Sequence, residues 1–362
     1  MPSALADVEW DACVLQPHRD RELEAYVRRE LGAVPSSVAY FTGVPWVVHS
    51  LSRIAGGVYL HVDSVLDDLI GLVVSQDNSC RYCFGLQRMM LRVHGVPDSR
   101  IRQLEQGLIE AEIDPRARAS LDFARRVSRA APLSAAADTR ELRAAGWDTA
   151  AIREMAFCAV NDVYANRLMT IAAIPYAPVE DLADTWSTRL LAPLIRVAMQ
   201  RRVRRHLARA AALGPEAARG PWAYLVGALE GLPGARVLRE TIDAALASPV
   251  LSTRAKALIF AVVARGLDCP QSEREASDLL ASTGLAPEVV EATLTHLGSP
   301  ELSAIENALV SFARSTIRGR PQRLQQNARE LLGLLSQNQL VEAVAVVALA
   351  NMVVRLDVIT EV

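Results

Sequence analysis

An internal repeat is the feature of this chain that most constrains its fold. Three pairs of residues or segments recur at an offset of 189 residues: Cys80 and Cys269, Gly95 and Gly284, and the Phe-Ala-Arg triplets at 123–125 and 312–314. Two further matches follow the same order: the Pro-Trp pairs at 45–46 and 221–222, at an offset of 176, and the segment 159–168, which is echoed by 348–356. Together they predict a duplicated unit of roughly 150 to 180 residues.

Composition and hydrophobic spacing predict helices throughout. Hydrophobic residues make up 51% of the chain and aromatic residues 5%, a balance that favours helices over sheets. Helices are expected at 20–31, 64–75, 81–93, 99–111, 115–129 and 149–171, and no stretch alternates as a strand would. We predict an all-α fold of two tandem helical domains, 1–180 and 216–362, the second degenerate, joined by a helical linker at 181–215.

Charge and hydropathy exclude several classes of partner. A net charge of −2 gives no bulk attraction to nucleic acid or to an anionic membrane. The stretch 201–206 (RRVRRH) could contact an anion, but the solvated face of a connecting helix is the favoured interpretation. The N-terminus has no apolar leader segment, and the longest apolar run, 344–354, is too short to span a bilayer and predicts a buried helix. We expect a cytoplasmic protein that binds neither nucleic acid nor membrane.

Residues 80–83 (CRYC) place two cysteines three positions apart at the predicted start of a helix. Both sulfurs would lie near the positive end of that helix, which favours thiolate over thiol. The thiolate attacks disulfides and peroxides, so Cys80 and Cys83 form a candidate redox pair. A zinc site would need a second pair or suitably spaced histidines, so neither a metal nor another cofactor is expected. Three other cysteines stand alone: Cys13, Cys158 and Cys269.

Residues 69–83 (LIGLVVSQDNSCRYC), the Gly-Val-Pro turn at 95–97 and the segment 161–168 resemble the AhpD-like (alkylhydroperoxidase D) and carboxymuconolactone decarboxylase superfamily. The resemblance covers most of the first repeat and, in degenerate form, the second. It implies an all-helical fold in oligomers of small subunits. In peroxidase-type members it implies a CxxC pair that reduces hydroperoxides and is re-reduced by a dithiol partner. For this chain we therefore expect a homo-oligomer, a dimer or a trimer.

The family's peroxidase motif falls on this chain with two changes. Its glutamate position is Asp68 and its histidine position is Gln87, whereas both cysteines are kept. Gln87 lies one helical turn after Cys83 and faces it, but an amide cannot accept a proton near neutral pH. Asp68 could still act as a base through water, and activation of the thiol would rest on the helix end and on Arg81. We expect slower or differently tuned peroxide chemistry.

Two histidines could replace the missing imidazole. His61 lies seven residues before Asp68, and His94 lies seven residues after Gln87. Two helical turns span about 10 Å, too far for direct contact, so both histidines are interpreted as surface or packing residues. Polar residues on a later predicted helix either line a pocket near the cysteines or bond between helices: Asn161, Asp162 and Asn166.

The second repeat lacks the site. At the offset of 189, the counterparts of Cys83, Gln87 and Asp68 are Ser272, Ala276 and Ala257. The remaining thiol cannot form a local disulfide, so this repeat is predicted to be structural.

Three hypotheses on function follow. The first is a thiol-dependent peroxidase or disulfide reductase, in which, following the resemblance, Cys83 attacks the peroxide and Cys80 closes the disulfide. The second is a small-molecule enzyme of the lactone-decarboxylating branch, which does not need CxxC. The third is a non-catalytic redox sensor or scaffold, favoured by the lost histidine. We expect the first, with a hydroperoxide or other small molecule as substrate and a dithiol as reductant.

Overall fold

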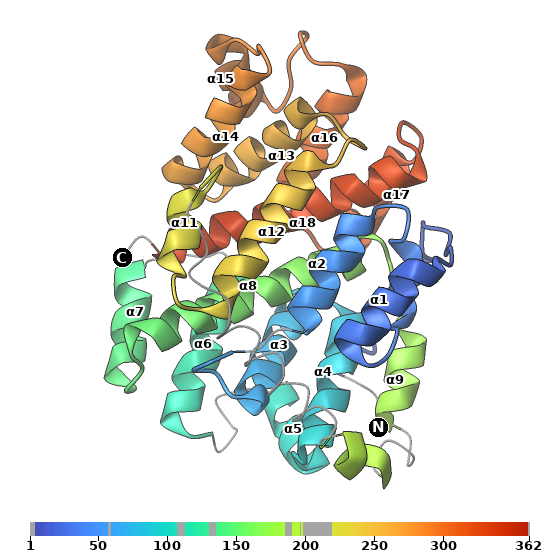
Figure 1. Ribbon diagram of the computed structural model, residues 1–362, viewed down its shortest axis with the longest axis vertical. Coiled ribbons are helices and arrows are strands. Elements are labelled where there is room, and N and C mark those ends of the chain that lie inside the picture. Colours follow the sequence, from blue (N-terminus) through green and yellow to red (C-terminus); the bar gives the residue numbers. More distant parts are fainter. Residues whose placement is uncertain are drawn as a thin grey trace.

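The protein is all-helical, as the sequence predicts (Figure 1). The computed structural model describes residues 4–56, 59–106, 113–129, 135–184, 190–195, 197 and 219–360, and no strand occurs within those ranges. The first half forms α1 (Arg21–Leu31), α2 (Pro45–Ala55), α3 (Ser64–Asp77), α4 (Arg81–His94), α5 (Asp98–Gln106), α6 (Pro115–Arg129), α7 (Ala135–Ala144), α8 (Thr149–Ile171) and α9 (Ala177–Asp184). The second half forms α11 (Ala223–Ala228), α12 (Pro233–Ala247), α13 (Thr253–Gly266), α14 (Pro270–Ser282), α15 (Pro287–His296), α16 (Ala304–Ser315), α17 (Pro321–Leu331) and α18 (Gln337–Thr360).

Capping residues explain why several helices begin where the sequence predicts. The side chain of Asp63 accepts hydrogen bonds from two backbone amides in the first turn of α3, and Asp148 does the same for one amide of α8. The observed bounds of α6 and α8 are those predicted, and α3 runs two residues beyond its predicted end. The predicted helix 99–111 begins as α5, but residues 107–112 lie outside the described part of the chain.

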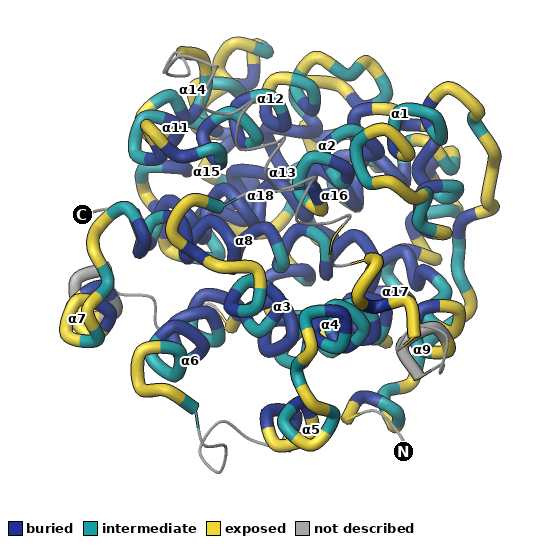
Figure 2. Tube along the Cα trace, turned by 60° about the horizontal axis from the view of Figure 1, so that its bottom comes forward, coloured by how far each residue is buried: buried dark blue, intermediate teal, exposed yellow. Residues whose placement is uncertain are grey.

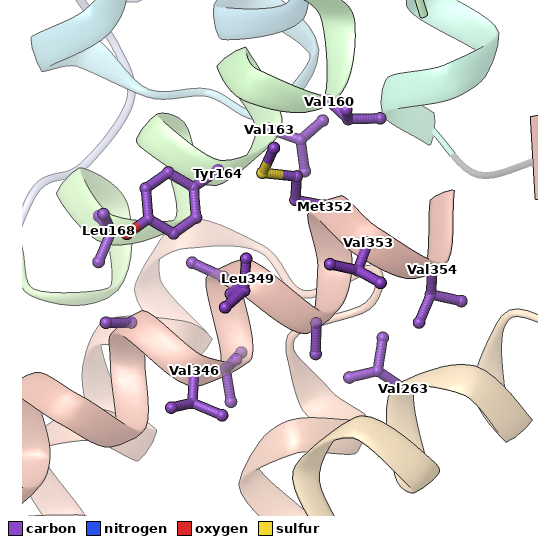
Figure 3. Packing of buried hydrophobic residues seen from close by; sticks show 14 of the residues in the cluster. Val160, Val163, Tyr164, Leu168, Val263, Val346, Leu349, Met352, Val353 and Val354 are labelled. Carbon is purple, nitrogen blue, oxygen red and sulfur yellow. The ribbon is translucent and has the colours of Figure 1, made fainter. Parts of the chain in front are cut away.

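The centre of the molecule is the packing of α18 along α8 (Figures 2 and 3). Val163 and Leu168 of α8 face Leu349 and Met352 of α18 in a dry, closely packed layer. The apolar run 344–354 is buried, as predicted. The helix that contains it has 24 residues and is long and apolar enough to cross a membrane by length and composition alone, although most of it is buried inside the fold.

The offset found in the sequence also relates the helices. Ser64 and Thr253 begin α3 and α13, and Arg81 and Pro270 begin α4 and α14, each pair 189 positions apart. Both halves contribute to one continuous hydrophobic core, and the division into two domains stays a prediction. Of the predicted linker 181–215, the first residues end α9 and 190–195 are helical, whereas the arginine-rich stretch lies outside the described residues.

A buried ion pair ties the two halves together. Lys256, in α13, is fully buried, and its Nζ lies 3.8 Å from Glu342 Oε1 of α18. The same carboxylate accepts a hydrogen bond of 3.0 Å from Trp46 Nε1 in α2 and another from the backbone of Leu251. Because a buried charge is costly without partners, this network fixes α2 against the second half of the chain.

Candidate functional site

The two cysteines of the CRYC segment lie at the turn between α3 and α4. Ser79 has a positive φ of 53°, which turns the chain sharply after α3. The next residue, Cys80, caps the N-terminus of α4, and its Sγ accepts a hydrogen bond of 3.4 Å from the backbone amide of Cys83. Cys80 is 0% exposed and Cys83 is 6% exposed, and both are free thiols. The structure thus places the dithiol in the first turn of a helix, as predicted.

The two sulfurs differ in acidity. Burial raises the pKa of the Cys80 thiol, but hydrogen bonds from the Cys83 thiol, from Thr170 and from backbone amides outweigh it, so the pKa lies below its ordinary value. Burial, the hydrogen bond to Cys80 and the charge of Cys80 raise the pKa of Cys83 well above its ordinary value. Of the two thiols, Cys80 is therefore the more acidic and loses its proton first. The prediction that the helix end favours thiolate at both sulfurs is wrong for Cys83, because the second charge would lie beside the first.

A buried arginine from α8 faces Cys80. Arg167 is 4% exposed, and its Nη2 donates a hydrogen bond of 3.1 Å to the carbonyl of Ile317. Burial lowers the pKa of Arg167 to about 10, and the negative charge of Cys80 opposes that effect. Sequence reasoning missed this residue, although the echo between 159–168 and 348–356 aligns it with Arg355, which is also buried and bonds to the same carbonyl.

The Gln87 side chain of α4 interacts with Asp162 of α8. The Gln87 side chain is hydrogen-bonded to the Asp162 carboxyl group. Both side chains converge on Gly71 of α3, where a Cβ atom would clash with Gln87 Nε2 and would lie 3.1 Å from Asp162 Oδ1. The absent side chain at Gly71 therefore makes room for this contact. The sequence had marked Asp162 as polar and near the cysteines, but nothing in it identified Gln87 as its partner.

Asp68 is instead paired with His94 at the other end of α4. The distance between Asp68 Oδ2 and His94 Nε2 is 3.1 Å, and both side chains are largely buried. The prediction that His94 makes no direct contact with the motif was wrong. The separation of about 10 Å was measured along α4, from Gln87 to His94, and did not apply to Asp68 on the neighbouring helix. Since α3 and α4 run antiparallel, residues distant from the turn in both helices meet across the hairpin. His61 is exposed, in agreement with its interpretation as a surface residue.

Three aspartates of α3 and α8, Asp67, Asp68 and Asp162, share an unfavourable environment. Burial and the charge of Asp68 raise the pKa of Asp67 from 3.8 to about 8. Burial followed by the charges of Asp67 and Asp68 raises the pKa of Asp162 well above its ordinary value. Burial also raises the pKa of Asp68, although His94 acts against it. Like charges so close together oppose one another's ionisation, and Asp67, with a pKa of about 8, keeps its proton near neutral pH.

Helix α9 covers the dithiol from outside. The Arg81 guanidinium, inside the CRYC segment, lies 3.1 Å from Glu180 Oε2 and 3.6 Å from the ring centre of Tyr176. A Cβ atom on Gly85 would lie 3.2 Å from Glu180 Cγ, so the glycine lets α9 approach α4 closely. Two surface hollows, at 16–18 with 337–338 and at 139–156 with 359–360, lie elsewhere. Reagents would therefore reach the thiols at the edge of α9 or after it moves.

The second half contains a different polar cluster at the equivalent position. Asp357 accepts hydrogen bonds from Cys269, Ser272 and Tyr224. Burial and the charge of Asp357 raise the pKa of Cys269 to about 12, so this sulfur is held as a thiol. The cluster agrees with the predicted structural role of the second repeat. Cys158 is buried, and burial also raises its pKa well above the ordinary value.

No protein-family model matches this chain, and no curated protein matches it. Within the described residues, no three His, Cys, Asp or Glu side chains gather as a metal centre would require. The described side chains offer two thiols of different acidity, a buried arginine that is affected by the charge of Cys80, and carboxyl groups with raised pKa values.

Proposed function

We propose that this chain is a thiol-dependent peroxidase of the AhpD-like type, which reduces hydroperoxides with Cys80 and Cys83 and is restored by an external dithiol. The observation that carries the proposal is the pair of adjacent thiols at the N-terminus of α4, where the Cys83 backbone amide donates to Cys80 Sγ and the pKa of Cys80 is lowered while that of Cys83 is raised. The resemblance of 69–83 to the family supports it. A structural cysteine pair would not need a lowered pKa at one sulfur.

The pair can begin the reaction without an external base. Cys83 passes its proton to the Cys80 thiolate along their hydrogen bond, and the Cys83 thiolate attacks the terminal oxygen of the hydroperoxide. The O–O bond breaks, leaving a sulfenic acid on Cys83 and an alkoxide that takes a proton to become the alcohol. Cys80 then attacks the Cys83 sulfur, water leaves, and a disulfide forms. Attack by Cys83 agrees with the family resemblance and with its greater exposure.

The changed motif residues take new roles in this proposal. Asp68 and His94 form a pair at the far end of the hairpin, where they hold α3 against α4. Gln87 orients Asp162. The proton transfer that the family's histidine would perform is here left to the two sulfurs, which explains how an amide can occupy that position.

A non-catalytic redox sensor is the second candidate, and the cover formed by α9 favours it. A dithiol beneath a helix held by an ion pair and a cation–π contact would react slowly and could signal by moving that helix. The lactone-decarboxylating alternative has no comparable support from the geometry of the site.

The deciding experiment follows consumption of tert-butyl hydroperoxide with dithiothreitol as reductant, for the wild type, Cys80→Ser and Cys83→Ser. Cys13→Ser is the matched control, because Cys13 is half-buried and belongs to no pair. We expect turnover in the wild type and the control and its loss in both site variants, with two thiols lost per oxidised chain. A disulfide that forms and is reduced without turnover would establish the sensor instead.

The proposal extends to the surroundings of the protein. A thioredoxin-type dithiol in the cytoplasm would keep the pair reduced. Assembly into a dimer or trimer belongs to the same proposal, and sedimentation of the purified chain tests it directly.

A further inference from the structure

We propose that Asp162 is the acid that protonates the departing alcohol, and that Gln87 holds it in place for that task. The inference rests on the proposed peroxidase function and deepens it. Without such an acid, a charged alkoxide would have to leave from a buried site when the O–O bond breaks.

Geometry places Asp162 beside the face of α4 that carries Cys83, and the charge of Asp162 acts on the pKa of Cys83. Gln87 lies one helical turn after Cys83, so the two side chains share one face of α4. Long side chains on a helix lean towards its N-terminus, which directs Gln87 towards Cys83. The carboxyl group of Asp162 bonds to Gln87 on that face, in the space left by Gly71. A peroxide in contact with Cys83 Sγ would therefore have the Asp162 carboxyl group as its neighbour.

The surroundings of Asp162 raise its pKa well above the ordinary value and so favour its protonated form, although the hydrogen bond from Gln87 acts against them. Asp67 and Asp68 face it from α3, and the charge of Cys80 faces it from α4. Each disfavours a further negative charge, as burial does. Arg167, one turn further along the same helix, is directed to Cys80 and to Ile317. A carboxyl group kept neutral in this way is a proton donor, and general acids of this kind contribute about 10²- to 10⁴-fold in rate.

The protons balance with Asp162 as the donor. Before reaction the site holds a Cys80 thiolate, a Cys83 thiol and a protonated Asp162. Attack on the hydroperoxide and closure of the disulfide release one alcohol and one water, and leave Asp162 ionised. The external dithiol then supplies two electrons and two protons, which restore one thiol and one carboxylic acid. No other proton source is needed during the oxidative half of the cycle.

The test exploits the leaving group. Asp162→Asn replaces a neutral acid by a neutral amide of the same shape, and Asp98→Asn, at the start of α5, is the matched control. Two oxidants are compared: tert-butyl hydroperoxide expels a strongly basic alkoxide, whereas peracetic acid expels acetate, which needs no proton. We expect Asp162→Asn to slow the first reaction about 100-fold and the second less than about 3-fold. Asp98→Asn should leave both rates at the wild-type value.

Alkylation by iodoacetamide distinguishes proton donation by Asp162 from an effect of its charge on the reactivity of the two thiols. Because Asp162 is neutral, its replacement by Asn should leave the alkylation rate of the dithiol unchanged. An increase in that rate, or an equal loss with both oxidants, would refute the inference. If Asp162→Asn does not fold, Gly71→Ala serves instead, because its new Cβ displaces Gln87. It should lower the rate with tert-butyl hydroperoxide more than the rate with peracetic acid, by a smaller factor than Asp162→Asn, and an equal loss with both oxidants would refute the inference. A wild-type protein that consumes neither oxidant would instead overturn the proposed function itself.

Discussion

The aspartate cluster predicts that the protein becomes less stable as the pH rises from 4 to 8. Asp67 has a pKa of about 8 when folded, because burial and the charge of Asp68 raise it from 3.8. In that window the folded state keeps a proton that the unfolded state has lost, so the free energy of unfolding falls with pH. At about 1.4 kcal/mol per pH unit the full loss would be about 6 kcal/mol. Since Asp67 is only half-buried, we expect about 2–3 kcal/mol.

Urea unfolding at pH 5 and pH 8 measures this loss. Asp67→Asn cannot ionise, so between these two pH values its stability should fall by about 2 kcal/mol less than that of the wild type. Asp63→Asn is the control, because Asp63 is an exposed N-cap and asparagine caps equally well. If Asp67→Asn loses as much stability between the two pH values as the wild type and the control do, the claim that folding raises the pKa of Asp67 is refuted.

Three further predictions concern packing and access. Leu349→Ala, in the layer between α8 and α18, should lower the free energy of unfolding by about 2–5 kcal/mol in urea titrations, because that layer cannot collapse around the lost atoms. Gly234→Ala should lower the melting temperature in a thermal scan, because the new Cβ would lie 2.7 Å from the ring of Phe157; an unchanged melting temperature would show that the ring can move. Glu180→Gln weakens the contact of α9 with Arg81 and should speed iodoacetamide alkylation of the native dithiol about two- to five-fold, and an unchanged rate would show that α9 does not limit access.

The helices were predictable from the sequence because their signals are local. Proline at the start of α6 and the capping Asp148 before α8 mark starts that need no knowledge of the rest of the fold. The position of the dithiol in the first turn of α4 was predictable for the same reason. The starts of α3 and α13, at Ser64 and Thr253, share the offset of 189 residues that was found in the sequence.

The partners within the site could not be predicted, because they depend on which helices meet. His94 reaches Asp68 across a hairpin, whereas the sequence argument measured distance along one helix. Gln87 meets Asp162 because Gly71 leaves a gap, and a glycine within a helix gives no sign of what fills the space beside it. The acidity of Cys83 depends on the charge of its neighbour, which a motif cannot give.

The buried ion pair between α13 and α18 makes the folded protein unreactive towards lysine-modifying reagents. Lys256 is the single lysine of the chain, and it is fully enclosed beside Glu342. A folded molecule therefore offers no lysine side chain to reagents or enzymes that modify amines. Labelling of this lysine would require α13 to separate from α18. A modified Lys256 would therefore report that the core between these two helices had opened.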